Sequence, residues 1–258
     1  MPVGFLTDVT LCIGCKACQV ACKQWNGLPG APETAFLSGQ SYDNTLRLSG
    51  DNWRHVAFVE SFDAASRQGR WLFLSDVCKH CEVAGCLEAC PTRAIVRTEY
   101  GTVLVRDDVC NGCGYCVAAC PFGVVGRSER DGGAHKCTFC VDRLGQEMEP
   151  ACAKACPTDA IVFGDLEKLR GRAAERVTAL RARGELGARI YGDERLGGAR
   201  LGGLHALFVI TDVPEAFGLP ENPERPAAHL LKDALLSAAF AACIVAALAT
   251  WFIAWPTG

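Results

Sequence analysis

The sequence predicts an α+β fold built from two related cysteine-rich halves, with one transmembrane helix at the C-terminal end. Three observations lead to this prediction. Sixteen of the 17 cysteines in this 258-residue chain fall into four tight groups of four. Short β-branched segments recur beside these groups, as is typical of strands. The stretch that follows Asp233 carries no charged residue.

The four cysteine groups share their outer spacings. In each group two residues separate the first two cysteines and three separate the last two, and a proline follows every group but the first. The groups are Cys12, Cys15, Cys18 and Cys22; Cys78, Cys81, Cys86 and Cys90; Cys110, Cys113, Cys116 and Cys120; and Cys137, Cys140, Cys152 and Cys156. The first and third groups match the C-x2-C-x2-C-x3-C run that binds [4Fe–4S] clusters in bacterial ferredoxins.

Iron–sulfur clusters explain this pattern better than disulfides or zinc. Disulfide frameworks spread cysteines along short secreted chains, whereas this longer sequence groups them and begins without a signal-peptide pattern. Structural zinc uses two ligand pairs per ion and has no role for a third cysteine two residues later. The sequence therefore predicts four [4Fe–4S] clusters, with a zinc-stabilised scaffold as the alternative from another class. A net charge of −3 with no long run of one sign argues against a nucleic-acid-binding surface.

The spacing within a group has a geometric reason. Three cysteines on a tight loop can bind three corners of one cluster, while the fourth, in a short helix, points toward a neighbouring cluster. Proline ends that helix because it lacks an N–H group and disfavours helix in the residue before it. Gly14, Gly112 and Gly114 allow the backbone to come close to a cluster.

The strand segments predict how the groups pair. Residues 94–99 and 102–107 form two β-branched runs around a Tyr-Gly turn, which predicts a hairpin between groups two and three. Groups two and three with this hairpin make one ferredoxin-like unit, residues 78–130. The segment GFLTDVT before group one and the segment PTDAIVFG after group four resemble the two halves of the hairpin region. We therefore expect residues 1–27 and 131–164 to form a second ferredoxin-like unit in a pseudo-twofold arrangement, whereas sequential pairing leaves the matched strands unexplained.

We call this arrangement, in which group two pairs with group three and group one pairs with group four, nested pairing. It predicts four ligand sets, numbered here one to four. They are Cys12, Cys15, Cys18 and Cys156 for set one; Cys22, Cys137, Cys140 and Cys152 for set two; Cys78, Cys81, Cys86 and Cys120 for set three; and Cys90, Cys110, Cys113 and Cys116 for set four. Cys243 has no partner in this scheme, and we expect it to be a small apolar filler.

The other segments carry weaker signals. Residues 28–77 contain a Gly/Pro-rich insertion and two strand-like runs, HVAFVESF and RWLFLSD. Residues 165–228 begin with DLEKLRGRAAERVTALRAR, a predicted surface helix, and continue with the strand-like GGLHALFVITD and a Pro-rich linker. Residues 229–258 are the predicted anchor. The 22 apolar residues of Ala234–Trp255 span roughly 33 Å as a helix, close to the thickness of the bilayer hydrocarbon, with a buried core helix as the alternative.

No catalytic constellation is present in the sequence. It has no P-loop, no GxGxxG after a strand, no nucleophile elbow and no HExxH motif. His80, His135 and Lys136 lie beside cluster cysteines, where hydrogen bonding is the expected role and tuning of a reduction potential the alternative. The sequence therefore predicts no catalytic residues and a role in electron transfer.

Four segments carry a resemblance to a known family. CIGCKACQVACKQWN, CNGCGYCVAACPFG, HKCTFCVDR and EPACAKACPTDAIVFG closely resemble the iron–sulfur (beta) subunit of membrane-bound formate dehydrogenases. That subunit is one of the four-cluster subunits that partner molybdenum or tungsten bis-pterin oxidoreductases. Four further matches favour the formate dehydrogenase subunit within this wider family: GGLHALFVI, GLPENPE, ERVTALRARG and the predicted C-terminal anchor.

The resemblance implies a relay in anaerobic respiration. Electrons would enter from a Mo/W bis-pterin catalytic (alpha) subunit, pass through four [4Fe–4S] clusters held by the nested ligand pattern, and reach a cytochrome b-type membrane (gamma) subunit and quinone. The C-terminal helix would lie in the bacterial inner membrane, with the cluster domain periplasmic. Arg225 and Lys232 before the helix favour the cytoplasmic side instead. The alternative is the same relay role beside a polysulfide, thiosulfate or sulfoxide reductase, or a hydrogenase.

Overall fold

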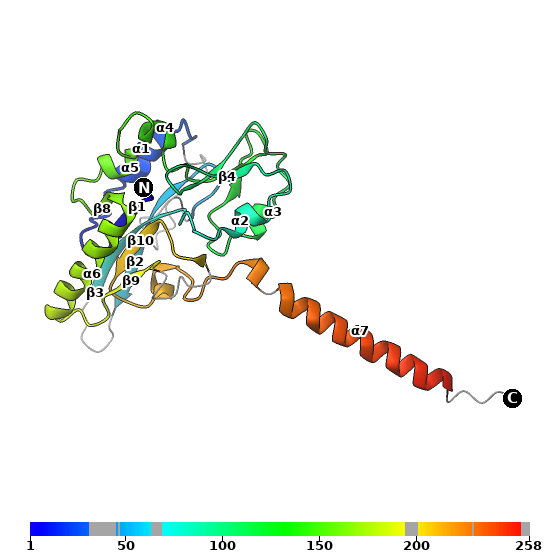
Figure 1. Ribbon diagram of the computed structural model, residues 1–258. Helices are drawn as coiled ribbons and strands as arrows, with labels where there is room; N and C mark the ends of the chain where they lie inside the picture. Colours follow the sequence, from blue (N-terminus) through cyan, green and yellow to red (C-terminus); the bar gives the residue numbers. More distant parts are fainter. Residues whose placement is uncertain (31–44, 46, 63–68, 194–200, 229, 254–258) are drawn as a thin grey trace. The chain divides into compact units, whose positions relative to one another are not determined.

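The structure is a computed structural model that describes residues 1–30, 45, 47–62, 69–193, 201–228 and 230–253 (Figure 1). The chain divides into two compact units, Met1–Arg225 and Pro226–Gly258. Part of the predicted insertion, residues 31–44, lies outside the described residues, as do residues 229 and 254–258 of the predicted anchor.

A four-stranded sheet organises the first unit. Its strand order is β8-β1-β10-β9, where β1 (Val3–Asp8) runs antiparallel to β8 (Ile161–Asp165) and parallel to β10 (Ala206–Ile210), and β10 runs antiparallel to β9 (Arg189–Tyr191). The pairing of β1 with β8 confirms the match between the segments before group one and after group four. β10 was expected as a strand, but not its place beside β1. All of its residues are buried, because covered faces lie on both sides of the sheet.

Helix α6 (Leu166–Ala182) covers one face of this sheet, as its helical spacing predicts. The Asp165 carboxylate accepts a hydrogen bond from the Lys168 backbone N–H at 3.1 Å and so caps the helix N-terminus. One stripe of α6 packs against Leu6, Val162, Leu207 and Val209 of the sheet. The buried residues of the stripe are Leu166, Leu169, Ala173, Val177 and Leu180.

Within the described part of the first unit, three antiparallel strand pairs lie outside this sheet. The predicted strand runs form β2 (Arg54–Phe62) with β3 (Gly69–Val77), and β4 (Ile95–Arg97) with β5 (Val103–Val105). The third hairpin, β6 (Gly126–Arg127) with β7 (Ala134–His135), is too short to give a sequence signal. The backbone at Gly126 passes so close to Gly50 that a side chain at either position would clash with backbone atoms.

Short helices carry the second half of each cysteine group. They are α1 (Ala17–Trp25), α2 (Gly85–Glu88), α3 (Tyr115–Ala118), α4 (Val141–Leu144) and α5 (Ala151–Lys154). Helix α1 of group one packs against α5 of group four, and α2 of group two packs against α3 of group three. Figure 1 shows α1, α4 and α5 gathered together, away from α2, α3 and β4. The helix packing therefore follows the nested order. A 3-10 turn, η3 (Pro214–Phe217), follows β10.

The second unit consists of a 3-10 turn, η4 (Pro226–Ala228), and helix α7 (Leu230–Ile253). Helix α7 exposes large apolar side chains along its length, among them Leu236, Phe240 and Val245. No helix within the described residues combines the length and hydropathy needed to cross a membrane.

Candidate functional site

Left-handed backbone residues shape the cysteine loops. In group one, Gly14 has φ +67° and Lys16, the residue before α1, has φ +60°. A side chain at Gly14 would also meet the Phe73 ring at 2.7 Å, so only glycine fits the loop there. In group three, Gly112 and Gly114 adopt the same left-handed conformation and precede α3. These left-handed residues turn the backbone within each cysteine loop just before its helix begins.

Two of the predicted ligand sets line cavities of their own. Set one lines a cavity beside Ile13 and Pro157. Set three lines a second cavity beside His80 and Phe122. Each cavity thus collects three cysteines from one group and the last cysteine of the group that nested pairing assigns to it.

In sets two and four, the thiolates of the predicted ligands interact electrostatically with one another. The Cys22 thiolate interacts with Cys152 and Cys140, and the Cys137 thiolate interacts with the same three. The Cys116 thiolate interacts with Cys110, Cys90 and Cys113. The structure therefore brings together the cysteines of sets two and four as well.

Electrostatic interactions between thiolates of different sets place the sets in one series. Cys22 of set two interacts with Cys18 of set one. Cys137 of set two interacts with Cys78 of set three, and Cys86 of set three interacts with Cys116 of set four. The order is therefore one, two, three, four. Cys15 of set one and Cys113 of set four are exposed, whereas every thiol of set two is buried.

Burial and crowding raise the pKa values of these thiols. Burial is the largest cause that raises the pKa of Cys12 to about 11, and the Cys18 and Cys156 thiolates raise it further. Burial raises the pKa of Cys86 to about 12, and the Lys136 ammonium opposes this shift. The pKa of Cys137 lies well above its ordinary value for the same first reason. Packing so many thiolates together is unfavourable unless a positively charged metal group holds them.

Polar groups directed at the sulfurs fit a bound cluster. The Phe139 backbone N–H donates to Cys137 Sγ at 3.3 Å, and the Ala134 backbone N–H donates to Cys110 Sγ at 3.4 Å. The Ser75 hydroxyl lies 3.1 Å from Cys18 Sγ. Such donors favour the thiolate form and tune the potential of a bound cluster. Among the described residues, no three His, Cys, Asp or Glu side chains have the arrangement that holds a single metal ion.

The residues beside the cysteines mostly make hydrogen bonds, as expected. The buried His80 Nδ1 accepts from the Val103 backbone N–H at 3.1 Å, and His135 Nε2 lies 2.8 Å from Asp131 Oδ2. Lys136 is buried and donates to the backbone carbonyls of Val103 and Cys137.

Sequence reasoning missed Arg54, Ser75 and Lys79. Arg54 and Ser75 lie on strands β2 and β3, outside the cysteine groups, whereas Lys79 lies between Cys78 and Cys81 of group two. All three side chains are buried. The sequence offered one signal, and only for Arg54 and Lys79: each is a charged residue near an outer end of the two predicted strands.

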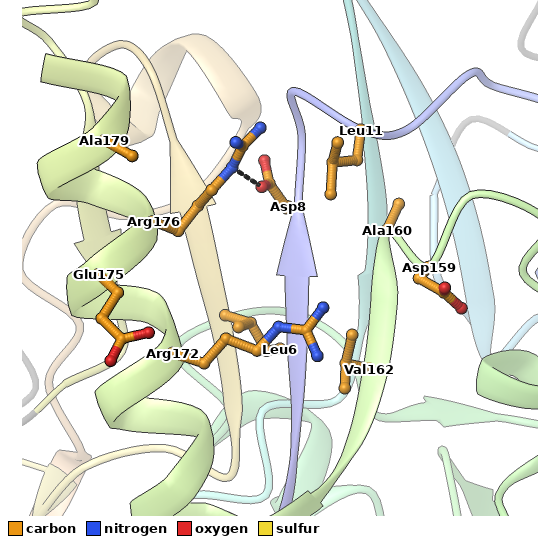
Figure 2. A pocket seen from close by; sticks show the side chains of 10 residues that line it. All are labelled: Leu6, Asp8, Leu11, Asp159, Ala160, Val162, Arg172, Glu175, Arg176 and Ala179. Atoms are coloured by element: carbon orange, nitrogen blue, oxygen red, sulfur yellow. Dashed lines mark hydrogen bonds and ion pairs between the residues drawn. The ribbon is translucent and has the colours of Figure 1, made fainter. Parts of the chain in front are cut away.

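A hollow of about 360 Å³ lies between α6 and strands β1 and β8 (Figure 2). In it, Arg176 donates to Asp8 Oδ2 at 2.6 Å, while Arg172 extends from α6 toward the strands (Figure 2). Its lining contains no cysteine, serine or histidine.

Comparison with known proteins agrees with the thiol geometry. Two family models, both described as 4Fe-4S dicluster domain, match this chain, one at residues 69–166 and the other at residues 11–94. The chain is 43% identical over 228 residues to the formate dehydrogenase-O iron–sulfur subunit of Escherichia coli, covering 86% of this chain and 72% of that protein. It is 40% identical to the formate dehydrogenase iron–sulfur subunit of Haemophilus influenzae, over 86% of this chain and 70% of that protein. It is 36% identical over 167 residues to one subunit of the anaerobic dimethyl sulfoxide reductase of Escherichia coli, covering 65% of this chain and 75% of that protein.

Proposed function

Because this protein belongs to the family of formate dehydrogenase iron–sulfur subunits, we propose that it is the electron-transfer subunit of a membrane-bound formate dehydrogenase. Electrons enter from a Mo/W bis-pterin catalytic subunit that oxidises formate. They leave to a cytochrome b-type membrane subunit that reduces quinone. The chain itself carries electrons and converts no substrate.

The observation that carries this proposal is the single series of thiol sets with an exposed cysteine at each end. Bound [4Fe–4S] clusters supply one-electron carriers. The four sets are the proposed ligands of four such clusters, and sets two and three, which contain no exposed thiol, keep the middle of the path away from water. The exposed Cys15 and Cys113 mark the two places where a partner's redox centre can approach. A relay needs two accessible ends and a protected interior, and the series supplies both.

The C-terminal helix is the proposed membrane anchor. Its 24 residues extend about 36 Å at ~1.5 Å per residue, more than the roughly 30 Å of bilayer hydrocarbon. Leu235, Leu236, Phe240, Ile244, Val245 and Leu248 are all between 45% and 70% exposed, an arrangement that favours lipid or a membrane subunit around the helix. We place this helix in the bacterial inner membrane, with the cluster domain on the periplasmic side.

The second candidate is the same relay in another Mo/W oxidoreductase. The similarity to a dimethyl sulfoxide reductase subunit favours this candidate, although it covers less of the sequence than the similarity to the formate dehydrogenase subunits. The thiol series serves either complex, because the catalytic partner decides the substrate.

Formate itself distinguishes the two candidates. The native complex is purified anaerobically in detergent through a tag on this chain, and formate alone is added while the visible iron–sulfur absorption is followed. We expect formate to bleach a large share of the absorption that dithionite bleaches afterwards. Bleaching by dithionite alone, in a complex that retains its catalytic subunit, would exclude formate dehydrogenase and leave the relay role. A colourless, zinc-containing preparation would exclude the relay.

A further inference from the structure

Arg54 is a buried cation whose surroundings differ from those of the other buried cations among the described residues. In the part of the chain that the structure describes, three lysine or arginine residues are buried: Arg54, Lys79 and Lys136. Burying a charge is costly unless a partner compensates it. Lys79 pairs with the Asp76 carboxylate, and Lys136 donates to two backbone carbonyls. Arg54 has neither kind of partner.

The guanidinium of Arg54 makes a single hydrogen bond. Its Nε donates to the Ser75 hydroxyl at 3.0 Å, while its Nη1 and Nη2 atoms are buried without any partner. The guanidinium also lies over the Phe5 ring, with 5.2 Å between its central carbon and the ring centroid. The side chain is 1% exposed. A guanidinium has five N–H donors, so most of the donor capacity of Arg54 is directed at something that the protein alone does not supply.

The charges nearest to Arg54 belong to two different ligand sets. Its guanidinium interacts with the Cys18 thiolate of set one and with the Cys152, Cys137 and Cys22 thiolates of set two. Ser75 links it to set one a second time. Because Arg54 Nε donates to the Ser75 hydroxyl oxygen, the hydroxyl hydrogen is free to bond Cys18 Sγ, 3.1 Å away. Arg54 thus lies where sets one and two meet.

We propose that Arg54 is the shared counter-charge of the first two clusters and raises the reduction potential of both. This inference rests on the proposed relay function. Each one-electron reduction adds one negative charge to a cluster that four thiolates already make anionic. A fixed positive charge in a dry environment therefore stabilises the reduced form more than the oxidised form. Arginine suits this role because it stays protonated when buried and its planar fork can face two groups at once.

Arg54 acts on the redox centres through space and is a positioning and tuning residue. The competing explanation is that the Arg54 side chain only fills space in the core and that its charge has no effect on the clusters. Substitutions that separate charge from volume distinguish the two: Arg54→Gln removes the charge, and Arg54→Lys keeps it. Arg70→Gln is the matched control, since Arg70 lies at the far end of the same hairpin, is exposed, and pairs with Glu185 at 3.0 Å. It makes the same change in net charge at a distance from the thiols.

The measurement is a mediated redox titration of each anaerobically purified complex, followed by EPR and normalised to iron content. For Arg54→Gln we expect two of the four clusters to become harder to reduce by about tenfold or more in equilibrium constant, each tenfold being ~59 mV for a one-electron couple. The other two clusters should keep their wild-type values. Arg54→Lys should hold both shifts to within about threefold, because the charge remains. Arg70→Gln should match the wild-type complex.

Several results would overturn the proposal. An intact Arg54→Gln complex with unchanged potentials would show that the charge does not act on the clusters. Equal shifts in all four clusters, or equal shifts in the Gln and Lys variants, would do the same. If Arg54→Gln fails to assemble, iron content decides the question. Loss of two clusters that Arg54→Lys restores supports the counter-charge, whereas loss of all clusters in both variants indicates a packing role. Failure of the relay function is a separate outcome, because it would appear as missing clusters in the wild-type complex.

Discussion

At the scale of single residues, the site is a balance between crowded thiolates and the groups that compensate them. Burial raises the pKa of Cys140 to about 11, and the neighbouring Cys152 thiolate adds to the shift. Without a cluster, such thiols keep their protons at neutral pH. Cluster binding must therefore release protons, and it couples assembly to the correct meeting of four cysteines from distant segments. This coupling makes the ligand sets testable by substitution.

Iron content should reveal which cysteines share a cluster. Cys12→Ala and Cys156→Ala should each remove one cluster's worth of iron, and the double variant should remove no more than either single variant, because both thiols belong to set one. Cys12→Ala with Cys137→Ala should remove two clusters. Cys243→Ala is the control and should lose none, since Cys243 lies in α7, away from every set in sequence. Chemical iron analysis of the purified complexes measures this.

The sequential alternative gives the opposite pattern. If group four paired with group three, Cys156 would share a cluster with Cys110. The variant lacking Cys12 and Cys156 would then lose two clusters' worth of iron. That result would contradict nested pairing.

A buried histidine outside the cysteine groups should make stability depend on pH. His205 Nδ1 donates to the Val3 carbonyl at 2.7 Å, and burial lowers the pKa of His205 below its ordinary value, with Glu82, Arg97 and Arg170 as its charged neighbours. As pH falls below about 6.5, the unfolded state binds a proton that the native state resists, so the free energy of unfolding decreases. This loss continues until the native pKa is reached.

His205→Asn should weaken that dependence, because the asparagine amide can keep the bond to the Val3 carbonyl but does not titrate. Melting temperatures of the wild-type and variant complexes at pH 7.5 and 5.5 provide the measurement. We expect a smaller acid-induced decrease in the variant. Identical decreases would mean that His205 titrates alike in the folded and unfolded states.

At the scale of secondary structure, the four-stranded sheet packs against a cysteine loop on one face and against α6 on the other. Phe5 of β1 stacks on Phe139 with 4.2 Å between ring centroids, on the face opposite α6. Phe139 follows Cys137 by two residues, so the core of the sheet is in direct contact with a cysteine loop. The other face of β1 and β10 needs α6 to exclude water. The stability of this packing should therefore depend on the buried stripe of α6.

Leu169→Ala tests that dependence. Leu169 is 4% exposed and packs between α6 and the sheet. The substitution should cost about 2–5 kcal/mol, from lost burial and the cavity left behind. The apparent melting temperature of the complex should fall by several degrees, at roughly 2–4 °C per kcal/mol for a protein of this size. Glu175→Ala, an exposed site on the same helix, should leave it nearly unchanged. Equal melting temperatures for both variants would contradict the supporting role of α6.

At the scale of the whole molecule, function depends on a path that no single segment contains. The series of thiol sets draws its members from segments that begin near residue 12 and end near residue 156. The proposed anchor belongs to a separate compact unit, Pro226–Gly258. The proposed redox path and the proposed anchor thus lie in different parts of the sequence, and substitutions can alter one without the other.

A charge in the proposed anchor should therefore release the protein from membranes and leave its clusters intact. Leu248→Arg introduces a cation into α7, at a cost of about 2.5–3.5 kcal/mol if the position lies near the bilayer centre. We expect less of the protein in alkaline-washed membranes and an unchanged iron content. Leu186→Arg is the control, because Leu186 is 81% exposed in the first unit. Equal membrane fractions for the two variants would contradict the anchor.

The sequence by itself determined the local features of this protein. Cysteine spacing predicted the cofactor, because a loop that binds a cluster needs thiols at fixed short intervals. The β-branched runs predicted β2, β3 and the β4–β5 hairpin, and the helical spacing predicted α6, because these signals repeat within a few residues. The matched segments around groups one and four also predicted the pairing of β1 with β8.

Only the tertiary structure decided which distant groups meet around the thiols. The two dicluster matches overlap at residues 69–94, so they leave the pairing of the groups open. The helix packing and the thiol contacts follow the nested order. Arg54 and Ser75 have no motif, since their position beside Cys18 depends on how the β2–β3 hairpin packs and not on local sequence. A motif records the residues that bind a cofactor, whereas the charges that surround it are set by contacts between segments far apart in the sequence.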